Sequence, residues 1–311
     1  MIEARNLTKR YAGRTAVDGL SFTARPGSVT GFLGPNGAGK STTMRLALGL
    51  DAPTAGTVTV AGRHYGRLPA PLREVGALLD ARAVHGGRTV RRHLLGLARS
   101  HGIPARRVDE VLDAVGLEAA ADRRAAGLSL GMAQRLGIAA ALIGDPGVLI
   151  LDEPVNGLDA EGIRWIRTLL KSLASEGRTV FLSSHLMSEL ELTADRIIVI
   201  GRGRLLADTD MRDFIERHSP DSTLLRTPEP SRMRALLEDH GAVVRPDPHG
   251  GLRVTGLATT AVGDLAREHG LALHELTPRR ASLEDIYTAV TGDAVEYRGS
   301  GTAEDDKETE R

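Results

Sequence analysis

Short apolar runs alternate with segments of helical spacing along the first two thirds of the chain. The apolar runs predict strands at 2–7, 20–24, 28–33, 57–61, 75–79, 148–151 and 179–183. Apolar residues three to four apart predict helices at 40–50, 90–100, 105–115, 129–143, 161–175 and 187–193. A hairpin follows at 196–200 and 204–208, turned by Gly201-Arg202-Gly203. Because strands alternate with helices, we predict a largely parallel sheet covered by helices.

The composition changes after Arg217, where proline and polar residues interrupt the pattern. Beyond it we predict strands at 222–226, 242–245, 252–254 and 271–276, with helices at 231–240 and 259–269. The order β-α-β-β-α-β is the ferredoxin-like pattern. A last helix is expected at 282–290, and the charged end, 304–311, lacks apolar anchors and is expected to be disordered. We therefore expect a large α/β domain at 1–217, an accessory α+β domain at 218–292 and a tail at 293–311.

A glycine-rich segment between a predicted strand and a predicted helix matches the pattern G-x-x-x-x-G-K-[ST]. Its residues are Gly34, Pro35, Asn36, Gly37, Ala38, Gly39, Lys40 and Ser41, with Thr42 following. Glycines let successive backbone N–H groups turn inward around an anion, and a helix N-terminus supports the same charge. Lys40 is placed for the β- and γ-phosphates of a nucleotide, and the Ser41 hydroxyl is a ligand for Mg²⁺. The alternative, an accidental glycine-rich turn, does not explain the strand–helix context.

Two acids follow the apolar run at 148–151. A buried parallel strand delivers Asp152 and Glu153 to its carboxyl end, where ligands bind in open α/β sheets. Asp152 is placed to join the Mg²⁺ shell, and Glu153 is placed to polarise an attacking water. The alternative is an ordinary acidic loop at a strand end.

With three further segments, these motifs resemble the ATP-binding-cassette (ABC) ATPase family from about residue 2 to residue 214. Leu128-Ser129-Leu130-Gly131-Met132 resembles the family signature, normally L-S-G-G-Q. The resemblance implies that Ser129 and Gly131 bind the phosphates of the ATP held by another subunit. Residues 156–159 resemble the D-loop, which ends in Asp159. His185 falls where the family places a histidine on the γ-phosphate, and Tyr11 falls where an aromatic ring stacks on adenine.

The chain departs from the family pattern at two places. Leu130 and Met132 replace the usual glycine and glutamine of the signature. Asp80 occupies the Q-loop position, where it either joins the Mg²⁺ site or points to solvent. An acidic residue there, and the ending at 282–287 followed by Thr291-Gly292, resemble the ABC-2-type exporter branch, which includes drug- and bacteriocin-resistance systems.

Composition narrows the classes of function. The 311 residues carry 40 basic and 40 acidic side chains, which argues against a dedicated nucleic-acid binder. No cysteine is present, and the ten histidines show no spacing typical of metal ligands. The N-terminus does not resemble a signal peptide, and every apolar run is far shorter than the ~20 residues of a membrane span. Any action at a membrane is therefore expected to require a partner.

The resemblance implies a RecA-like α/β core with an N-terminal antiparallel β portion and a helical subdomain inserted at about 89–143. It implies an ATPase that uses Mg²⁺ and pairs with a second copy of itself, so that each signature closes over the other subunit's ATP. A separate transmembrane permease would be the partner, which places the chain on the cytoplasmic side of the membrane and makes export the expected direction. The alternatives are a soluble ABC ATPase acting on nucleic acid or the ribosome, and a nucleotide sensor without turnover. The sensor would lack Glu153 or His185, and both are present.

Overall fold

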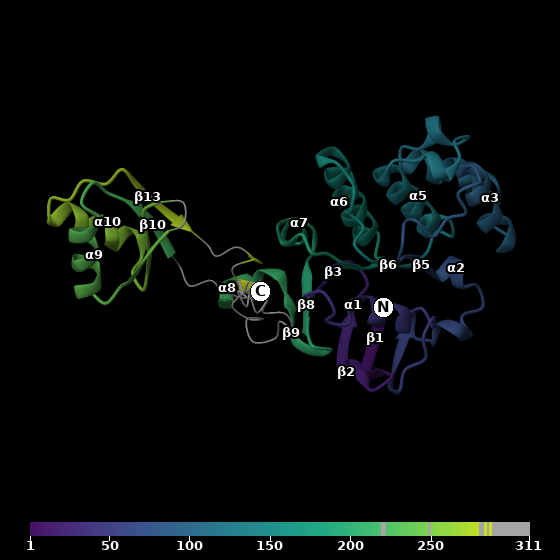
Figure 1. The fold of residues 1–311 in the computed structure, drawn as a ribbon, viewed down its shortest axis with the longest axis horizontal. Coiled ribbons are helices and arrows are strands. Elements are labelled where there is room, and N and C mark those ends of the chain that lie inside the picture. Colours follow the sequence, from purple (N-terminus) through teal and green to yellow (C-terminus); the bar gives the residue numbers. More distant parts are fainter. Residues whose placement is uncertain (219–221, 248–249, 280–282, 285, 288–311) are drawn as a thin grey trace, which may run out of the picture.

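The computed structural model describes residues 1–218, 222–247, 250–279, 283–284 and 286–287. A six-stranded sheet runs through the larger part of the molecule (Figure 1). Its strands, in spatial order, are β5 (Val75–Leu78), β6 (Val148–Leu151), β7 (Thr179–Ser183), β3 (Ser28–Leu33), β8 (Arg196–Gly201) and β9 (Arg204–Asp210). The first five are parallel, and only β9 pairs antiparallel, through the hairpin with β8. The predicted parallel sheet is confirmed.

Alternate residues of these strands lie on opposite faces of the sheet and belong to two separate hydrophobic cores. In β6, Leu149 and Leu151 belong to one core, whereas Val148 and Ile150 belong to the other. All four are buried, which is why the strand reads as an unbroken apolar run. The first core is covered by α6 (Ala160–Ser175) and by α7 (Met187–Thr193), which continue the chain after β6 and β7.

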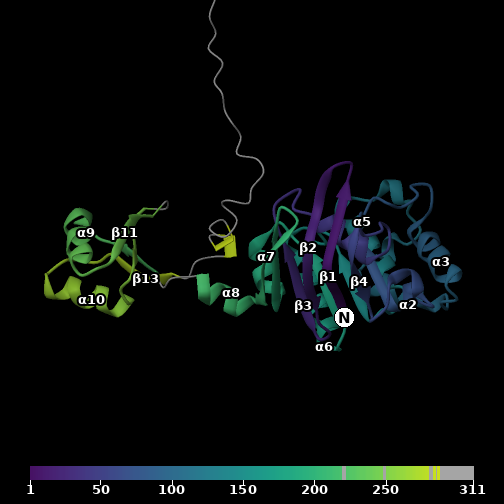
Figure 2. The ribbon, with the colours of Figure 1, turned by 90° about the horizontal axis from the view of Figure 1, so that it is seen from below.

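The second core lies between the six-stranded sheet and a three-stranded antiparallel sheet (Figure 2). That smaller sheet consists of β2 (Arg14–Ala24), β1 (Ile2–Tyr11) and β4 (Ala55–Val60), in this order. Helix α1 (Lys40–Ala47) packs between the two sheets and contributes Met44 to this core. The N-terminal antiparallel portion is therefore confirmed, although β1 and β2 are both longer than predicted. Helix α2 (Pro71–Glu74), one turn long, precedes β5 and was not predicted.

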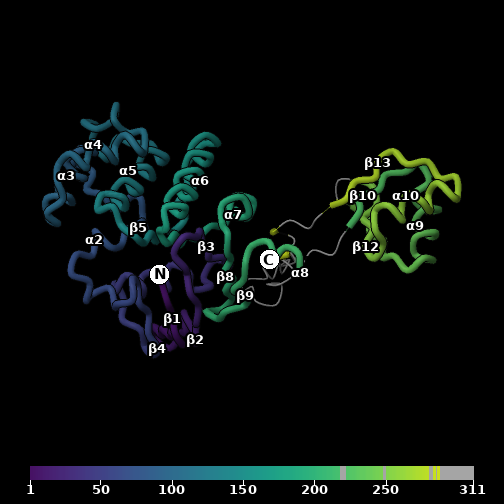
Figure 3. The backbone as a smooth tube through the Cα atoms, turned by 180° about the vertical axis from the view of Figure 1, so that it is seen from behind, coloured from purple at the N-terminus to yellow at the C-terminus, as the bar shows by residue number. Residues whose placement is uncertain are grey.

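Three helices form the inserted helical subdomain at one end of the sheet (Figure 3). They are α3 (Val90–Ser100), α4 (Arg106–Ala114) and α5 (Leu130–Leu142). Helix α3 begins at a Thr89 cap, whose hydroxyl accepts a hydrogen bond from the Arg92 N–H. Helix α5 packs against β5 and thereby joins the subdomain to the sheet.

The C-terminal unit is a four-stranded antiparallel sheet with two helices. Its elements are β10 (Ser222–Arg226), α9 (Pro230–Asp239), β11 (Val243–Pro246), β12 (Leu252–Thr255), α10 (Thr259–Glu268) and β13 (Glu275–Arg279). The strand order β11-β12-β10-β13 is that of a ferredoxin-like sheet, as predicted. The predicted strand at 271–276 is misplaced, because Leu271 is buried in the core without sheet pairing and the strand begins only where Glu275 pairs with Arg226.

Two segments bound this unit. Helix α8 (Met211–His218) was not predicted, yet its Met211 and Phe214 are buried in the first core. On the other side, Leu283 and Ile286 join that same core, and the Leu283 N–H donates to the Glu191 carboxylate of α7 (3.3 Å). Most of the predicted helix at 282–290, and the predicted tail, lie outside the described residues.

Candidate nucleotide site

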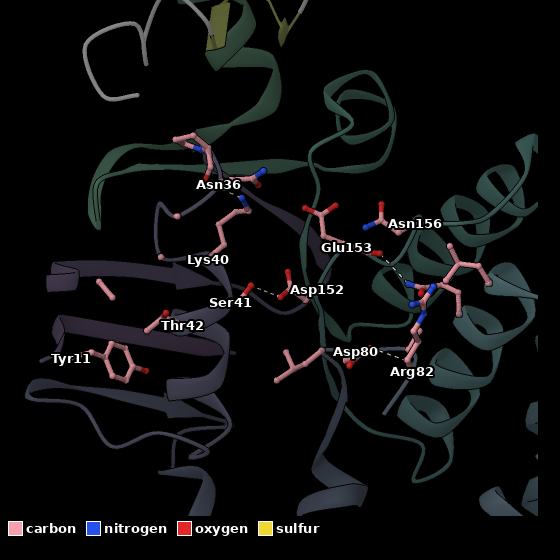
Figure 4. A pocket seen from close by; sticks show the side chains of 18 of the residues that line it. Tyr11, Asn36, Lys40, Ser41, Thr42, Asp80, Arg82, Asp152, Glu153 and Asn156 are labelled. Carbon is pink, nitrogen blue, oxygen red and sulfur yellow. Dashed lines mark hydrogen bonds between the residues drawn. The ribbon is translucent and has the colours of Figure 1, made fainter. Parts of the chain in front are cut away.

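A cleft of about 710 Å³ opens at the carboxyl ends of the central parallel strands. Its walls come from the N-terminal strands, the glycine-rich loop, the end of β6, the loop after β5 and the start of α5 (Figure 4). The lining includes eleven of the predicted site residues, namely Tyr11, Pro35, Asn36, Gly37, Gly39, Lys40, Ser41, Thr42, Asp80, Asp152 and Glu153. Residues far apart in the sequence therefore meet where the topology predicted.

The glycine-rich loop needs glycine for geometric reasons. Gly37 and Gly39 have φ of 80° and 105°, a region that residues with a Cβ rarely adopt. A Cβ on Gly39 would lie 2.4 Å from the Ala16 carbonyl oxygen, and one on Gly34 would lie 2.7 Å from the Ile200 carbonyl oxygen. The loop is thus pressed against neighbouring backbone on both sides. It leads directly into α1, whose N-terminus supports an anion.

Lys40 is the first residue of α1 and is only 8% exposed. Its Nζ donates to the Gly34 carbonyl oxygen at 2.6 Å and to that of Pro35 at 3.3 Å. Burial lowers the pKa of Lys40, and the nearby Glu153 and Asp152 carboxylates oppose that shift. The loop thus holds the ammonium group in the cleft through these two carbonyl oxygens.

Hydroxyl and carboxylate oxygens converge beside the loop. The Ser41 hydroxyl donates to Asp152 Oδ2 at 2.6 Å, and the Ser183 hydroxyl donates to Asp152 Oδ1 at 2.5 Å (Figure 4). Hard oxygen ligands of this kind suit Mg²⁺, which takes one or two protein groups and keeps water and phosphate for the rest. The residues present therefore fit a magnesium ion. Asp80 lies at the rim, where its Oδ1 accepts a hydrogen bond from the Arg82 N–H at 2.8 Å.

Glu153 has a left-handed backbone, with φ of 51°. Its carboxylate oxygen Oε2 lies 2.7 Å from Nδ1 of His185 and also accepts from the His185 N–H at 3.2 Å. His185 is not among the lining residues of the cleft, but it is bonded to one that is. The structure therefore brings the two predicted catalytic residues into direct contact.

Tyr11 stands at the opposite end of the cleft from Glu153 (Figure 4). Its hydroxyl donates to Asp51 Oδ2 at 2.9 Å, Arg45 Nε donates to the same oxygen at 2.7 Å, and Lys9 Nζ lies 4.8 Å from the ring centroid. Burial, together with the hydrogen bond to Asp51, raises the pKa of Tyr11. The Arg45 hydrogen bond, and then that from Tyr11, lower the pKa of Asp51. The ring is braced through its hydroxyl and remains 40% exposed, which leaves area for a base to stack.

Of the signature and the D-loop, Leu130 and Asn156 line this cleft, whereas Ser129, Gly131 and Asp159 do not. The Ser129 hydroxyl caps α5 by accepting from the Met132 N–H at 3.2 Å, and Asp159 caps α6 by accepting from the Gly162 N–H at 2.8 Å. A Cβ on Gly131 would lie 2.8 Å from the Gly157 carbonyl oxygen, so signature and D-loop pack together within one chain.

Sequence reasoning missed three polar residues around the site. Ser183 ends a predicted strand and was given no role, although it bonds both Asp152 and the Glu153 N–H. Gln134 is buried on α5 and bonds the Glu153 carbonyl oxygen. Asp51 follows α1 and gives no pattern of its own. A signal existed only for Gln134, a polar residue on the buried side of an apolar helix.

Comparisons with known proteins agree on one family. A profile described as "ABC transporter" matches residues 17–156, and one described as a domain of unknown function matches residues 221–284. The uncharacterized ABC transporter ATP-binding protein YhcH of Bacillus subtilis is 37% identical over 95% of this chain and 97% of its own length. The bacitracin transport ATP-binding protein BcrA of Bacillus licheniformis is 36% identical over 94% and 97%. The Nod factor export ATP-binding protein I of Paraburkholderia xenovorans is 41% identical over 72% and 79%.

Among solved structures, the dimeric post-hydrolysis state of the ATP-binding cassette MJ0796, bound to ADP and Pi, matches with a TM-score of 0.63 and 26% identity, over 68% of this chain and 99% of that one. Within the described part of the chain, every helix is too short or too polar to cross a lipid bilayer. The same residues contain no cluster of three or more histidine, aspartate or glutamate side chains arranged to hold a metal ion by themselves.

Proposed function

The chain belongs to the ATP-binding subunits of ABC transporters and hydrolyses ATP to drive transport, and from this premise we propose that it powers export through a separate transmembrane permease. Relatives named for bacitracin transport and for Nod factor export support an exporter of the ABC-2 type. The acidic residue Asp80 at the Q-loop position supports the same branch.

Each polar group of the cleft takes one part of the reaction. The inward N–H groups of residues 34–41 and the Lys40 ammonium bind the phosphates, while the exposed face of Tyr11 stacks on adenine. Ser41 and Asp152 hold Mg²⁺, which when bound neutralises charge on the β- and γ-phosphates. Glu153 orients and polarises the attacking water, and His185 fixes the Glu153 carboxylate through its 2.7 Å contact and reaches the γ-phosphate.

One observation supports a dimer. The cleft carries loop, metal ligands and base, but Ser129 and Gly131 lie outside it at the N-terminus of α5. A helix N-terminus with a capping serine is an anion-binding group that the chain's own ATP does not use. We assign it to the ATP of a second copy, so that two ATP molecules bind two subunits head to tail and hydrolysis releases them. Cyclic closure would drive the permease from the cytoplasmic side of the membrane.

The division of labour along the chain follows the same proposal. Residues 1–217 form the nucleotide-binding domain, with Asp159 in its D-loop, residues 218–292 form an accessory domain and residues 293–311 form a charged tail. The accessory sheet and its helices contain none of the nucleotide motifs, so we assign that domain to dimer support or to contact with the permease.

Size-exclusion chromatography of a hydrolysis-slowed protein tests the sandwich. Glu153→Gln should form a dimer with ATP and Mg²⁺, and adding Ser129→Arg should abolish that dimer while leaving the ATP affinity of the monomer unchanged. Ser175→Arg is the matched control, because it places the same charge on the exposed far end of α6, about 24 Å along the helix from Asp159. An undiminished dimer in the Ser129→Arg protein contradicts the assignment of the signature to the second ATP.

A further inference from the structure

A buried amide connects the signature helix to the catalytic glutamate. Gln134 lies on α5, five residues after Ser129, and is 4% exposed among apolar neighbours such as Leu136 and Ile138. A buried amide is costly unless its groups are hydrogen-bonded. Its Nε2 donates to the Glu153 carbonyl oxygen at 3.0 Å. Because a carbonyl oxygen only accepts, it is the nitrogen end of the amide that must face Glu153.

Glu153 has an unusual backbone that needs such support. Its φ of 51° lies in the left-handed region, which a residue with a Cβ rarely occupies. Its N–H donates to the Ser183 hydroxyl at 2.9 Å, from the end of β7. Its carbonyl oxygen accepts from Gln134 and from the Asn156 N–H at 3.2 Å. Strained backbone at a functional site persists only where the surroundings hold it, and here the holding groups come from three separate segments.

We propose that Gln134 is a positioning residue for ATP hydrolysis, which holds the left-handed turn at Glu153 so that the carboxylate faces the attacking water. The proposal rests on the function assigned to Glu153 above. According to this proposal, α5 contacts two ATP sites, that of the second copy and that of its own chain. At its N-terminus Ser129 meets the ATP of the second copy, and about 7.5 Å further along the same rigid helix Gln134 holds the base of its own site. Closure over one ATP is thereby linked to the placement of the base at the other.

Gln134→Leu removes the donor and keeps most of the volume. We expect kcat to fall by about tenfold to hundredfold, since a misplacement of about 1 Å can cost that much in rate. Gln134 lines the cleft, but its hydrogen bond is to Glu153 and not to the phosphate loop, Lys40 or Tyr11. We therefore expect the Kd for ATP to stay within about twofold. Gln134→Met serves as a second donor-free variant if the leucine protein is unstable. An unchanged kcat, or a raised Kd with unchanged kcat, overturns the proposal.

A double variant separates positioning from general damage. If Gln134 acts only through the Glu153 carboxylate, Gln134→Leu combined with Glu153→Gln should hydrolyse ATP no more slowly than Glu153→Gln alone. If the fold-decrease in kcat of the double variant equals the product of those of the two single variants, Gln134 acts elsewhere. Trp165→Phe is the control, because it deletes the hydrogen bond from Trp165 Nε1 to the Ala114 carbonyl oxygen (3.2 Å) without touching Glu153. It should leave kcat unchanged.

The ATP-induced dimer distinguishes this proposal from the proposed function. Gln134→Leu in the Glu153→Gln background should still dimerise with ATP, because Ser129 and Gly131 are intact. Loss of the dimer only when Gln134 is changed overturns the positioning role and shows that Gln134 maintains the signature. Absence of the dimer in Glu153→Gln alone contradicts the sandwich itself, while the kcat of Gln134→Leu still tests the positioning role.

Discussion

The two large sheets of this chain differ in strand direction, and that difference decides where chemistry collects. In the six-stranded sheet β3, β6 and β7 are parallel, so their carboxyl ends meet at one edge. Lys40, Asp152 and His185 all follow those ends and fall within reach of one another. In the four-stranded sheet all pairings are antiparallel, so neighbouring strands end at opposite edges. Its ion pairs, such as Arg226 with Glu275, join neighbouring residues of the sheet and do not gather at one edge.

Buried polar groups follow the same division. In the described part of the nucleotide-binding region, Lys40, Gln134 and Ser183 are buried and all bond around the cleft. In the C-terminal unit the buried Thr223 shares a hydrogen bond with Thr259, which only joins β10 to α10. These three buried polar groups therefore bond around the proposed nucleotide site, whereas Thr223 and Thr259 serve packing. Substitutions in the two regions should separate activity from stability.

The largest expected effect is that of Glu153→Gln. Loss of a positioned general base typically costs 10²–10⁴ in rate, so turnover should fall by about that factor. The affinity for ATP should persist, since the phosphate contacts of Lys40 and the loop are untouched. Turnover is measured by phosphate release, and binding by calorimetry. Hydrolysis at the wild-type rate would remove Glu153 from its assigned role.

Leu237→Ala tests whether a substitution in the C-terminal unit affects stability without affecting activity. Leu237 is fully buried in the core of the C-terminal unit, beside Met233 and Leu225. Its truncation should lower the free energy of unfolding of that unit by about 2–5 kcal/mol. The kcat for ATP should remain unchanged. Urea unfolding with and without ATP identifies which transition is weakened, because ATP should shift only the transition of the nucleotide-binding region. Phosphate release measures kcat.

Leu112→Ala is the matched control in the nucleotide-binding region. Leu112 is also fully buried, within the helical subdomain. The Leu112→Ala substitution should lower the free energy of unfolding by a similar amount. The affected transition should be the one that ATP shifts. A fall in kcat with Leu237→Ala comparable to that with Glu153→Gln would break the separation between the two regions.

The same contrast explains what the sequence allowed us to predict. Motif spacing located the phosphate loop, Asp152 and Glu153, because a strand end and a helix start are fixed by short local patterns. Strand and helix positions were also largely right, since both faces of β6 are buried and its apolar run is unmistakable. The chain order of elements in the C-terminal unit indicated the ferredoxin-like pattern, which its sheet has.

What the sequence did not reveal depends on contacts between distant segments. Helix α8 was missed because Met211 and Phe214 are its only fully buried apolar residues, and their burial depends on the sheet above them. The hydrogen bonds of Gln134 and Ser183 with Glu153 join α5 and β7 to the end of β6. No local sequence pattern indicates them. The brace of Tyr11 by Asp51 spans 40 residues of sequence for the same reason.

A smaller effect concerns pH. Burial lowers the pKa of Lys40 below its ordinary value, against the opposing carboxylates. As pH rises through that lowered pKa, the ammonium loses its proton, and ATP binding must take a proton up again. The affinity for ATP should therefore begin to fall at a lower pH than the pKa of an ordinary lysine would allow. In the nucleotide-free protein the sign is opposite, because a lowered pKa of a base adds stability as pH rises toward the ordinary value.

Adenosine is the control ligand for this titration. It stacks on Tyr11 but has no phosphate for Lys40, and the raised pKa of Tyr11 moves the ionisation of that hydroxyl to higher pH. Calorimetry in two buffers of different ionisation enthalpy should show proton uptake with ATP and none with adenosine. Equal pH dependence for the two ligands would exclude Lys40 as the titrating group.

The smallest expected effect is that of Asp80, at the rim where the cleft meets the loop after β5. A carboxylate there adds negative charge near Asp152 and Glu153, which strengthens binding of a divalent cation and repels the γ-phosphate when the cation is scarce. A pair of charges about 4 Å apart in water interacts by about 1 kcal/mol, so the expected shift in half-saturating Mg²⁺ is only about two- to fivefold. Turnover of the wild type should depend more steeply on free Mg²⁺ than turnover of Asp80→Gln. Asp80→Asn sharpens the test, because its amide oxygen can still accept from the Arg82 N–H, as Asp80 Oδ1 does at 2.8 Å, without the charge. If Asp80→Asn follows Asp80→Gln, the charge is responsible. Superimposable curves for all three proteins would mean that Asp80 only shapes its loop and has no part in the metal site.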